Sequence, residues 1–293
     1  MRDRLDVRPS STSPGLFVSI ELAARIDKAE ARLSAAFGEV AVARRPETAF
    51  VDSITGGVAV FASPSSPVNK MIGVGFEGLP SDEALAVVEE KFRARGAALQ
   101  AEISTLADAA FAATLSRRGY VLQGFENVLG RRLDAGDAEV PADPAGFEVR
   151  LIEPQDFDAW VAVSITGFAS PDLQGVPAEP LPPRETLEGT LRELAEAPGF
   201  RRYAAWVDGR MAGCASLRLD DGLAQLCGAA TLPEFRRRGI QTAFLHRRLA
   251  DAVAAGCDLA LVTTQPGSKS QQNSQQQGFA LLYSRAVLVK APV

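Results

Sequence analysis

The stretch TLPEFRRRGIQTAFLHRRLADAVAAG, residues 231–256, decides the fold of the second half of this chain. It predicts a helix from about Arg238, because its apolar residues recur at spacings of three and four. These apolar residues are Ile240, Phe244, Leu245, Leu249, Ala252 and Val253. Gly256 can end the helix with a left-handed cap. Because a helix begins with partial positive charge, each arginine there is unfavourable by about 0.3–1 kcal/mol. Arg236, Arg237 and Arg238 therefore require an explanation other than stability.

An anion is the simplest partner for an arginine-rich turn that enters a helix. The first backbone N–H groups of a helix lack internal acceptors and point beyond its end. Gly239 lets a bulky anion approach the backbone, and arginines add charge-assisted hydrogen bonds. A pyrophosphate group fits this arrangement. A nucleotide P-loop does not fit, because the Gly-Lys-Ser/Thr motif is absent, and neither does a Rossmann fingerprint, because GxGxxG is absent.

The composition narrows the class of protein. The 293 residues are 46% hydrophobic with a net charge of −5, which indicates one large or two ordinary globular domains and argues against nucleic-acid binding. The N-terminal stretch MRDRLDVRPSSTSPG lacks a signal-peptide core, and no apolar run is long enough to span a membrane. Cys214, Cys227 and Cys257 lie in apolar runs without metal-ligand spacing, so we expect buried thiols and no metal. A cytoplasmic location is expected.

The second half, 147–293, begins with an alternating strand at 147–154 and continues with two helical stretches. Asp208-Gly209 and Asp221-Gly222 then separate apolar runs, which predicts an antiparallel meander of three strands. After the arginine-rich helix, 257–264 is a short buried strand in a parallel crossover. A polar helical stretch, SKSQQNSQQQ, leads into a closing strand.

The first half has a similar order of elements, which indicates a diverged internal duplication. We expect domains at 1–135 and 147–293, with 136–146 as a Pro- and Gly-rich linker. The two copies differ at the start of the helix that carries the arginines in the second copy. In the first half the corresponding helix begins with Ser81, Asp82 and Glu83, which suit a capped helix and would repel a phosphate. The first half is therefore expected to lack the anion site and to be structural.

RRRGIQ, after a strand and at the start of a helix, resembles the acyl-CoA-binding signature of the GNAT N-acetyltransferase superfamily. That signature is Arg or Gln, two residues, Gly, one residue, then Gly or Ala. Arg236 and Gly239 match it, whereas Gln241 stands where Gly or Ala is usual. The resemblance covers about 147–293. It implies an α/β fold with a mixed, mostly antiparallel sheet flanked by helices, here in tandem halves.

The resemblance also implies a coenzyme site for acetyl-CoA. Backbone N–H groups of the turn and helix start would bind the pyrophosphate, next to the Arg236 side chain; they belong to Arg237, Arg238, Gly239, Ile240, Gln241 and Thr242. The strand end, Ala230, Thr231 and Leu232, would bind the pantetheine arm through its backbone. Ser270 and Asn273 are the best candidates to touch the arm from the polar helix. A helix cap for Ser270 and a solvated position for Asn273 are alternative roles.

The family reaction is direct attack of an amine on the acyl-CoA thioester. It needs a backbone donor for the oxyanion, for which Leu232 N–H is the candidate, and a proton donor for the thiolate. Tyr283 is the nearby tyrosine for that second role, with a half-buried strand position as the alternative. No base stands out in the sequence. Gln225 cannot act as one, and a water relay is as plausible as any side chain. Asp220 and Asp221 are expected to be turn residues, not bases. His246 is expected on the solvated side of its helix.

The acceptor is not identified by the sequence beyond an amine, small or on a peptide. The loop at 169–185 carries Asp172 and Glu179, which could attract a cation or be incidental surface charges. The first half could also close over the site and form part of the acceptor pocket. The leading expectation is an acetyl-CoA-dependent N-acetyltransferase without nucleic-acid or membrane partners. A non-catalytic acyl-CoA sensor and a coenzyme-free structural protein are the alternatives, and a homodimer stays open.

Overall fold

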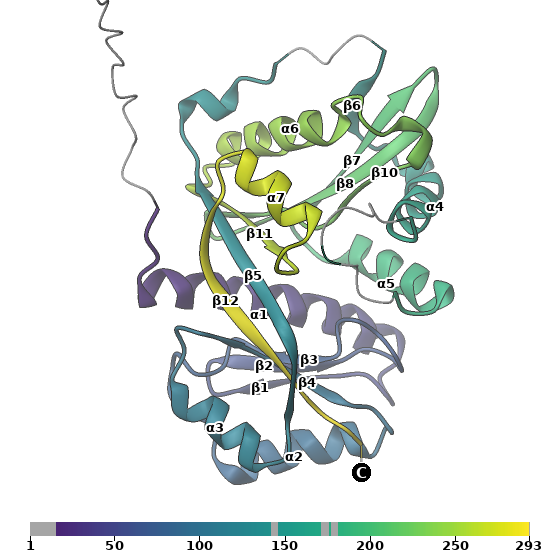
Figure 1. Ribbon diagram of the computed structural model, residues 1–293. Helices are drawn as coiled ribbons and strands as arrows, with labels where there is room; N and C mark the ends of the chain where they lie inside the picture. The colour runs from purple at the N-terminus through teal and green to yellow at the C-terminus, as the bar shows by residue number, and fades with distance from the viewer. Residues whose placement is uncertain (1–15, 142–145, 171–175, 177–180, 293) are drawn as a thin grey trace, which may run out of the picture.

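A computed structural model describes residues 16–141, 146–170, 176 and 181–292, and it forms one mixed sheet flanked by helices (Figure 1). The strands of the first half of the chain are β1 Phe50–Ile54, β2 Gly57–Phe61, β3 Lys70–Ile72, β4 Leu99–Ser104 and β5 Val121–Arg132. Those of the second half are β6 Glu148–Leu151, β7 Phe200–Val207, β8 Arg210–Asp220, β9 Leu223–Gln225, β10 Ala229–Thr231, β11 Leu259–Thr264 and β12 Ala280–Lys290. Only β3 with β4 and β9 with β11 pair in parallel among the described strands, so the expected mixed, mostly antiparallel sheet is confirmed.

The α-helices are α1 Ile20–Arg44, α2 Asp82–Arg93, α3 Ala109–Arg117, α4 Phe157–Phe168, α5 Arg184–Glu196, α6 Ile240–Ala254 and α7 Lys269–Gln276. Short 3-10 helices in the described residues are η1 Ala135–Ala138, η2 Pro154–Asp156 and η3 Pro233–Phe235. Within the described ranges, none of the helices combines the length and the apolar character that crossing a membrane requires.

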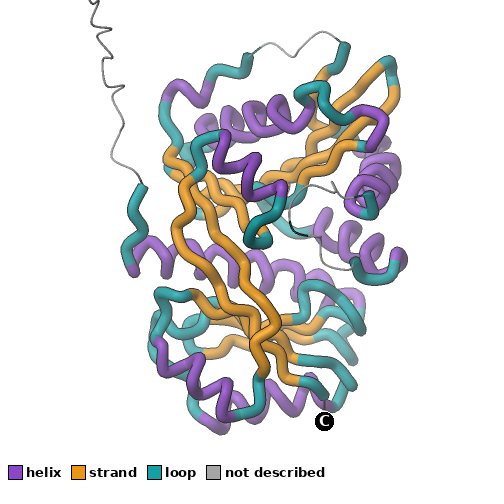
Figure 2. Tube along the Cα trace, viewed as in Figure 1, coloured by secondary structure: helices purple, strands orange, loops and turns teal. Residues whose placement is uncertain are grey.

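The two halves exchange their last strands. The sheet order is β1-β2-β3-β4-β12-β5-β11-β9-β8-β7-β6, with β10 attached to β8. Thus β12, from the end of the chain, pairs with β4, and β5, from the first half, pairs with β11. The long β5–β12 pair crosses the middle of the molecule (Figure 2). Each half therefore completes the sheet of the other, a feature that the expected boundaries at 135 and 147 do not describe. The division remains a proposal about chain order, and the expected linker includes residues 142–145, which lie outside the described ranges.

The meander of the second half is confirmed, and its turns have the conformation that its sequence favours. Asp208 and Gly209 have φ of 48° and 74°, and Asp221 and Gly222 have φ of 50° and 73°. Two successive positive φ values are typical of the tight turn between antiparallel strands, and Asp-Gly is well suited to it. The hairpins β7–β8 and β8–β9 follow from these turns.

Helix α1 belongs to the first half by sequence but packs against strands of both halves. Its buried residues Ala23 and Ile26 share an apolar cluster with Leu223 and Leu261 of the second half. Ion pairs also join it to the second half, including Arg25 with Asp258 at 2.6 Å. Apolar burial holds α1 against the sheet but does not by itself orient the helix. The ion pairs require a specific geometry, so they fix the orientation of α1 on the sheet.

In the first half, the helix that corresponds to α6 is α2, and its N-terminus is capped by a side chain. Ser81 caps α2 as expected, because its Oγ accepts a hydrogen bond from Ala84 N–H at 3.2 Å. Asp82 and Glu83 follow in the first turn, where acidic side chains favour the positive end of the helix. An anion would meet two carboxylates there.

Candidate active site

The strands of the second half separate next to α6. Strand β9 pairs with β8 on one side and, over Leu223–Gln225, with β11 on the other. Leu226 N–H then donates to Leu261 O at 2.8 Å. Strand β10 pairs only with β8, so its other edge and the edge of β11 beyond Leu261 have no strand partner in the described chain. The sheet is open between β10 and β11.

A bulge at Leu226–Gly228 causes this separation. In β8, Arg218 faces Gln225, whereas Ala215 faces Ala229, so the facing strand contains one residue more than β8. Such an extra residue bends a strand away from its neighbour. Gly228 has φ +65°, and a Cβ there would lie 3.2 Å from the Phe168 ring. The glycine in LCGAATL is therefore required by both backbone conformation and close packing.

The pairing of β10 decides which of its backbone groups face the opening. Leu232 N–H donates to Ala212 O at 2.9 Å, and Ser216 N–H donates to Gly228 O at 3.1 Å. Because hydrogen bonding alternates along an antiparallel pair, Ala230 also faces β8, and Ala229 and Thr231 face the opening. The structure thus corrects the assignment of Leu232: its N–H is already bonded within the sheet. Of Ala230, Thr231 and Leu232, only Thr231 presents its N–H to the open edge.

The turn before α6 leaves a continuous run of backbone donors free. Residues 237–242 donate no backbone hydrogen bond within the described chain, and the first helical bond runs from Ala243 N–H to Gly239 O at 3.0 Å. Arg237 has φ +61° and Gly239 has φ +86°. Left-handed residues among right-handed ones turn successive N–H groups toward one point, which makes an anion-binding concavity. A strained non-glycine residue such as Arg237 is typical of functional sites.

The three arginines do different things around this turn. Arg236 Nε donates to Thr231 O at 3.2 Å, and its Nη2 donates to Ser170 O, so this side chain fastens the turn to β10 and α4. The Arg238 guanidinium lies over the Phe235 ring at 5.5 Å. Arg237 is exposed and has no ion pair among the described residues. Arg237 and Arg238 are thus the cations left for a ligand. Nearby Ile240 is buried and Thr242 is exposed.

Gln241 stands where the family signature has a small residue. Its Nε2 donates to Thr231 Oγ1 at 2.8 Å, so the longer side chain folds back toward β10. The departure from the signature therefore adds a side-chain contact between the helix start and β10.

Helix α7 lies beside β11 and β5. Its cap is Ser268, whose Oγ accepts from Gln271 N–H at 3.2 Å, so the alternative role of Ser270 as a cap is excluded. Ser270 and Asn273 are both exposed on this helix. Their proposed contact with a pantetheine arm stays a prediction.

Tyr283 is directed away from the open edge, and this corrects its proposed role as an acid. Its hydroxyl donates to Asp27 Oδ1 of α1 at 2.7 Å, and its side chain is buried. Burial raises the pKa of Tyr283 well above its usual value. A phenol held by a buried carboxylate on α1 cannot protonate a departing thiolate between β10 and β11.

Of the two aspartates expected in a turn, Asp221 lies there, whereas Asp220 is the last residue of β8. Asp220 forms ion pairs with Arg32 at 2.9 Å and Arg218 at 3.1 Å, and Asp221 lies in the β8–β9 turn. The loop carboxylates Asp172 and Glu179 fall outside the described residues.

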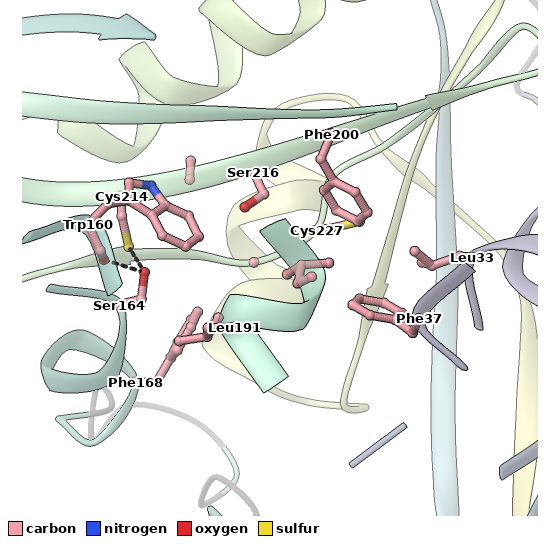
Figure 3. Close-up of a pocket in the computed structure, with 13 residues that line it drawn as sticks. Leu33, Phe37, Trp160, Ser164, Phe168, Leu191, Phe200, Cys214, Ser216 and Cys227 are labelled. Atoms are coloured by element: carbon pink, nitrogen blue, oxygen red, sulfur yellow. Dashed lines mark hydrogen bonds between the residues drawn. The ribbon is translucent and has the colours of Figure 1, made fainter. Parts of the chain in front are cut away.

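An apolar cavity of about 210 Å³ lies on the α4 and α5 face of the sheet. Figure 3 shows Leu33 and Phe37 of α1 at one end and Trp160 of α4 at the other. Cys227 and Gly228 of the bulge also line it. The cavity therefore meets the sheet where β10 leaves β11, and the first half of the chain contributes part of its wall.

Sequence reasoning missed two features of this site. Cys227 and Gly228 have N–H groups without an acceptor in the described chain, at the point where the strands separate. Glu30 of α1 accepts a hydrogen bond from Gln225 Nε2 at 3.0 Å. The glycine inside an apolar strand was a signal for the bulge. The signal for Glu30 was a carboxylate in line with Ile26, Leu33 and Phe37 on the apolar side of a helix.

Comparisons with known proteins agree with this geometry. The model of the acetyltransferase (GNAT) family matches residues 169–279, which include the bulge, β10 and α6. Mycothiol acetyltransferase from Clavibacter sepedonicus is 30% identical over 145 residues, which are 50% of this chain and 42% of that protein. A second mycothiol acetyltransferase, from Clavibacter michiganensis, is 30% identical over 149 residues, 51% of this chain and 46% of that protein. The match thus spans less than half of each relative.

Solved structures share the fold over most of the chain. A GCN5-related N-acetyltransferase from Kribbella flavida superposes with a TM-score of 0.61 at 18% identity, covering 89% of this chain and 95% of the other. A tandem GNAT protein from the clavulanic acid biosynthesis pathway gives a TM-score of 0.60 at 15% identity, with 88% of each chain covered. By sequence the C-terminal half therefore matches the GNAT acetyltransferase family, and over most of its length the chain has the fold of a tandem GNAT protein.

Proposed function

We propose that this protein is an N-acetyltransferase that transfers the acetyl group of acetyl-CoA to a primary amine. One observation carries the proposal: the six free N–H groups of residues 237–242 lie at the start of α6, next to the open edge of β10. The free N–H groups and positive end of α6 suit a pyrophosphate, and the open edge suits the amide-containing pantetheine arm. The family match in this half supports acetyl-CoA as the donor.

The thioester then lies at the bulge, where the opening between the strands ends. The free N–H groups of Cys227 and Gly228 take the role first given to Leu232, as donors to the oxyanion that forms when the amine attacks. The cavity on the other side of the bulge receives the acceptor. Donor and acceptor thus approach the same point of the sheet from different sides.

The test begins with thermal unfolding in the presence of acetyl-CoA, with ATP as a phosphate control. A ligand at about 100 times its Kd adds about 2.7 kcal/mol to the stability of the protein that binds it. Release of free CoA thiol on mixing with primary amines then measures turnover. Stabilisation by acetyl-CoA and not by ATP, followed by amine-dependent thiol release, supports the proposal. Equal stabilities with and without acetyl-CoA at saturating concentrations contradict it.

A second function is favoured by one observation. The two groups first expected to act in catalysis, Leu232 N–H and the Tyr283 hydroxyl, are bonded to Ala212 and Asp27. A chain that binds acetyl-CoA without turnover would be an acyl-CoA sensor. Stabilisation by acetyl-CoA without thiol release for any amine distinguishes this second function from the first.

A further inference from the structure

We propose that the acceptor is a primary amine with a small apolar substituent, that this substituent fills the cavity, and that Glu30 takes the proton of its ammonium group. The inference rests on the proposed acetyl transfer and adds the class of acceptor and the identity of the base. Glu30 is contributed by α1, from the half of the chain that has no arginine-rich turn.

The cavity selects for an apolar group by its walls. Leu33, Phe37, Trp160, Leu191 and Phe200 line it from four different elements. Ser164, one of its few polar side chains, already donates to Trp160 O at 2.8 Å. A dry cavity of about 150 Å³ in another protein accommodates benzene. The 210 Å³ here therefore suits one ring or a short aliphatic chain. A hydroxylated acceptor would lose most of its water partners there, because nearly all of the cavity wall is apolar.

Glu30 does not itself line the cavity but lies on α1 next to the two residues of this helix that do. It precedes Leu33 by three residues and Phe37 by seven, so all three lie on one face of α1. Gln225 Nε2 donates to Glu30 Oε2 at 3.0 Å, and Arg218 Nη1 donates to Gln225 Oε1 at 2.6 Å. The Gln225 amide is thus oriented so that its N–H, and not its oxygen, meets the carboxylate.

Gln225 lies on the strand before the bulge, two residues from Cys227, which lines the cavity. Gln225 cannot itself act as a base, but α1 brings the carboxylate of Glu30 to it across space. Glu30 is half-buried, and its Oε1 accepts no hydrogen bond within the described chain. That oxygen is available to an ammonium group whose substituent occupies the cavity. The other ionisable groups whose charges act around this part of α1 are Lys70, Glu126, Cys227 and Arg285.

The reaction balances without another reagent. Glu30 takes one proton from the ammonium group and passes it to water. The free nitrogen lone pair forms the C–N bond with the acetyl carbonyl carbon, and the C–S bond breaks. The second proton lost by nitrogen goes to the departing thiolate, so the products are the acetamide, free CoA and one proton.

The first test uses the unaltered protein and a series of linear amines from propylamine to hexylamine, with ethanolamine as the polar comparison. We expect kcat/KM to rise about fourfold for each added methylene until the cavity is filled, because each becomes buried. Ethanolamine should react more slowly than propylamine. A kcat/KM independent of chain length, or a preference for ethanolamine, overturns the inference while acetyl transfer itself stands. No stabilisation by acetyl-CoA at all contradicts the proposed function instead.

The second test compares Glu30→Gln with Glu39→Gln, which alters an exposed carboxylate of the same helix. General-base removal should lower kcat at neutral pH by about 100-fold or more. The rate of Glu30→Gln should then rise tenfold per pH unit toward the pKa of the free amine, because only unprotonated amine reacts. Stabilisation by acetyl-CoA should be unchanged in both variants, which shows that they fold. A Glu30→Gln variant with the pH profile of the unaltered protein overturns the role of Glu30.

Discussion

The Arg285 guanidinium of β12 lies 2.6 Å from the Asp27 carboxylate of α1, and each side chain is 1% exposed. The same Asp27 Oδ1 accepts the Tyr283 hydroxyl at 2.7 Å. This pair joins the first helix of the chain to its last strand across the middle of the sheet. Removal of either side chain alone would leave the other charge buried without its direct partner, so the two depend on each other in this packing.

Asp27→Asn is accordingly expected to lower the free energy of unfolding by about 3–5 kcal/mol, because it removes the carboxylate that is in direct contact with the buried Arg285 guanidinium. Thermal unfolding should detect this as a Tm decrease of about 2–4 °C per kcal/mol. Glu90→Gln breaks an exposed ion pair with Arg93 and should barely change Tm. Equal Tm values for the two variants would contradict the assigned importance of the buried pair.

Arg237→Ala and Arg238→Ala should each raise the Kd for CoA by about tenfold, since a hydrogen bond to a charged group contributes about 1.5–3 kcal/mol. Isothermal titration at low and high salt measures this, and binding should weaken with salt. Arg117→Ala removes an exposed arginine of α3 and serves as the control. If all three variants bind CoA equally, the arginine-rich turn is not the pyrophosphate site.

Gly228→Ala is expected to lower kcat by about tenfold or more with little change in the Kd for CoA. The alanine would place a Cβ 3.2 Å from Phe168 and strain a backbone with φ +65°, which displaces the proposed oxyanion donors. Gly256→Ala is the control. Gly256 has a similar φ of 78°, and no atom lies within 4 Å of the added Cβ, so this variant introduces the backbone strain at a position far from the bulge. Loss of kcat in both variants would argue against a specific role for the bulge.

Glu126 of β5 should make stability depend on pH. Burial and the neighbouring Glu102 raise the pKa of Glu126 from 4.5 to about 7. Between these values the folded chain holds a proton that the unfolded chain releases, so the contribution of Glu126 to stability falls as pH rises from about 4.5 to 7. Glu126→Gln should therefore raise Tm at pH 8 and change it little at pH 4.5. An equal effect at both pH values would contradict this assignment.

Much of the fold could be predicted because its signals are local. The Asp-Gly turns, the apolar stripe of α6 and the cap at Ser81 each depend on residues close in sequence. The exchange of β5 and β12 could not be predicted, because it depends on which strand edge each long strand meets. A strand carries the same alternation of apolar residues whichever neighbour it pairs with.

The candidate site divides in the same way. The free N–H groups before α6 were expected from the residues alone, since glycine and the helix start create them locally. Three other features could not be predicted from the sequence, because each depends on a partner far away in the chain. They are the hydrogen bond of Leu232 N–H, the position of Tyr283 and the contact of Glu30 with Gln225.

The sequence by itself determined the order of the elements, the turn before α6 and the class of ligand that this turn suits. Only the tertiary structure decided that β10 separates from β11, that α1 closes one end of the cavity, and that Glu30 meets Gln225. The physical reason is the range of the interactions. Backbone conformation and capping act over a few residues, whereas strand pairing, burial and charge contacts join residues that only the folded chain brings together.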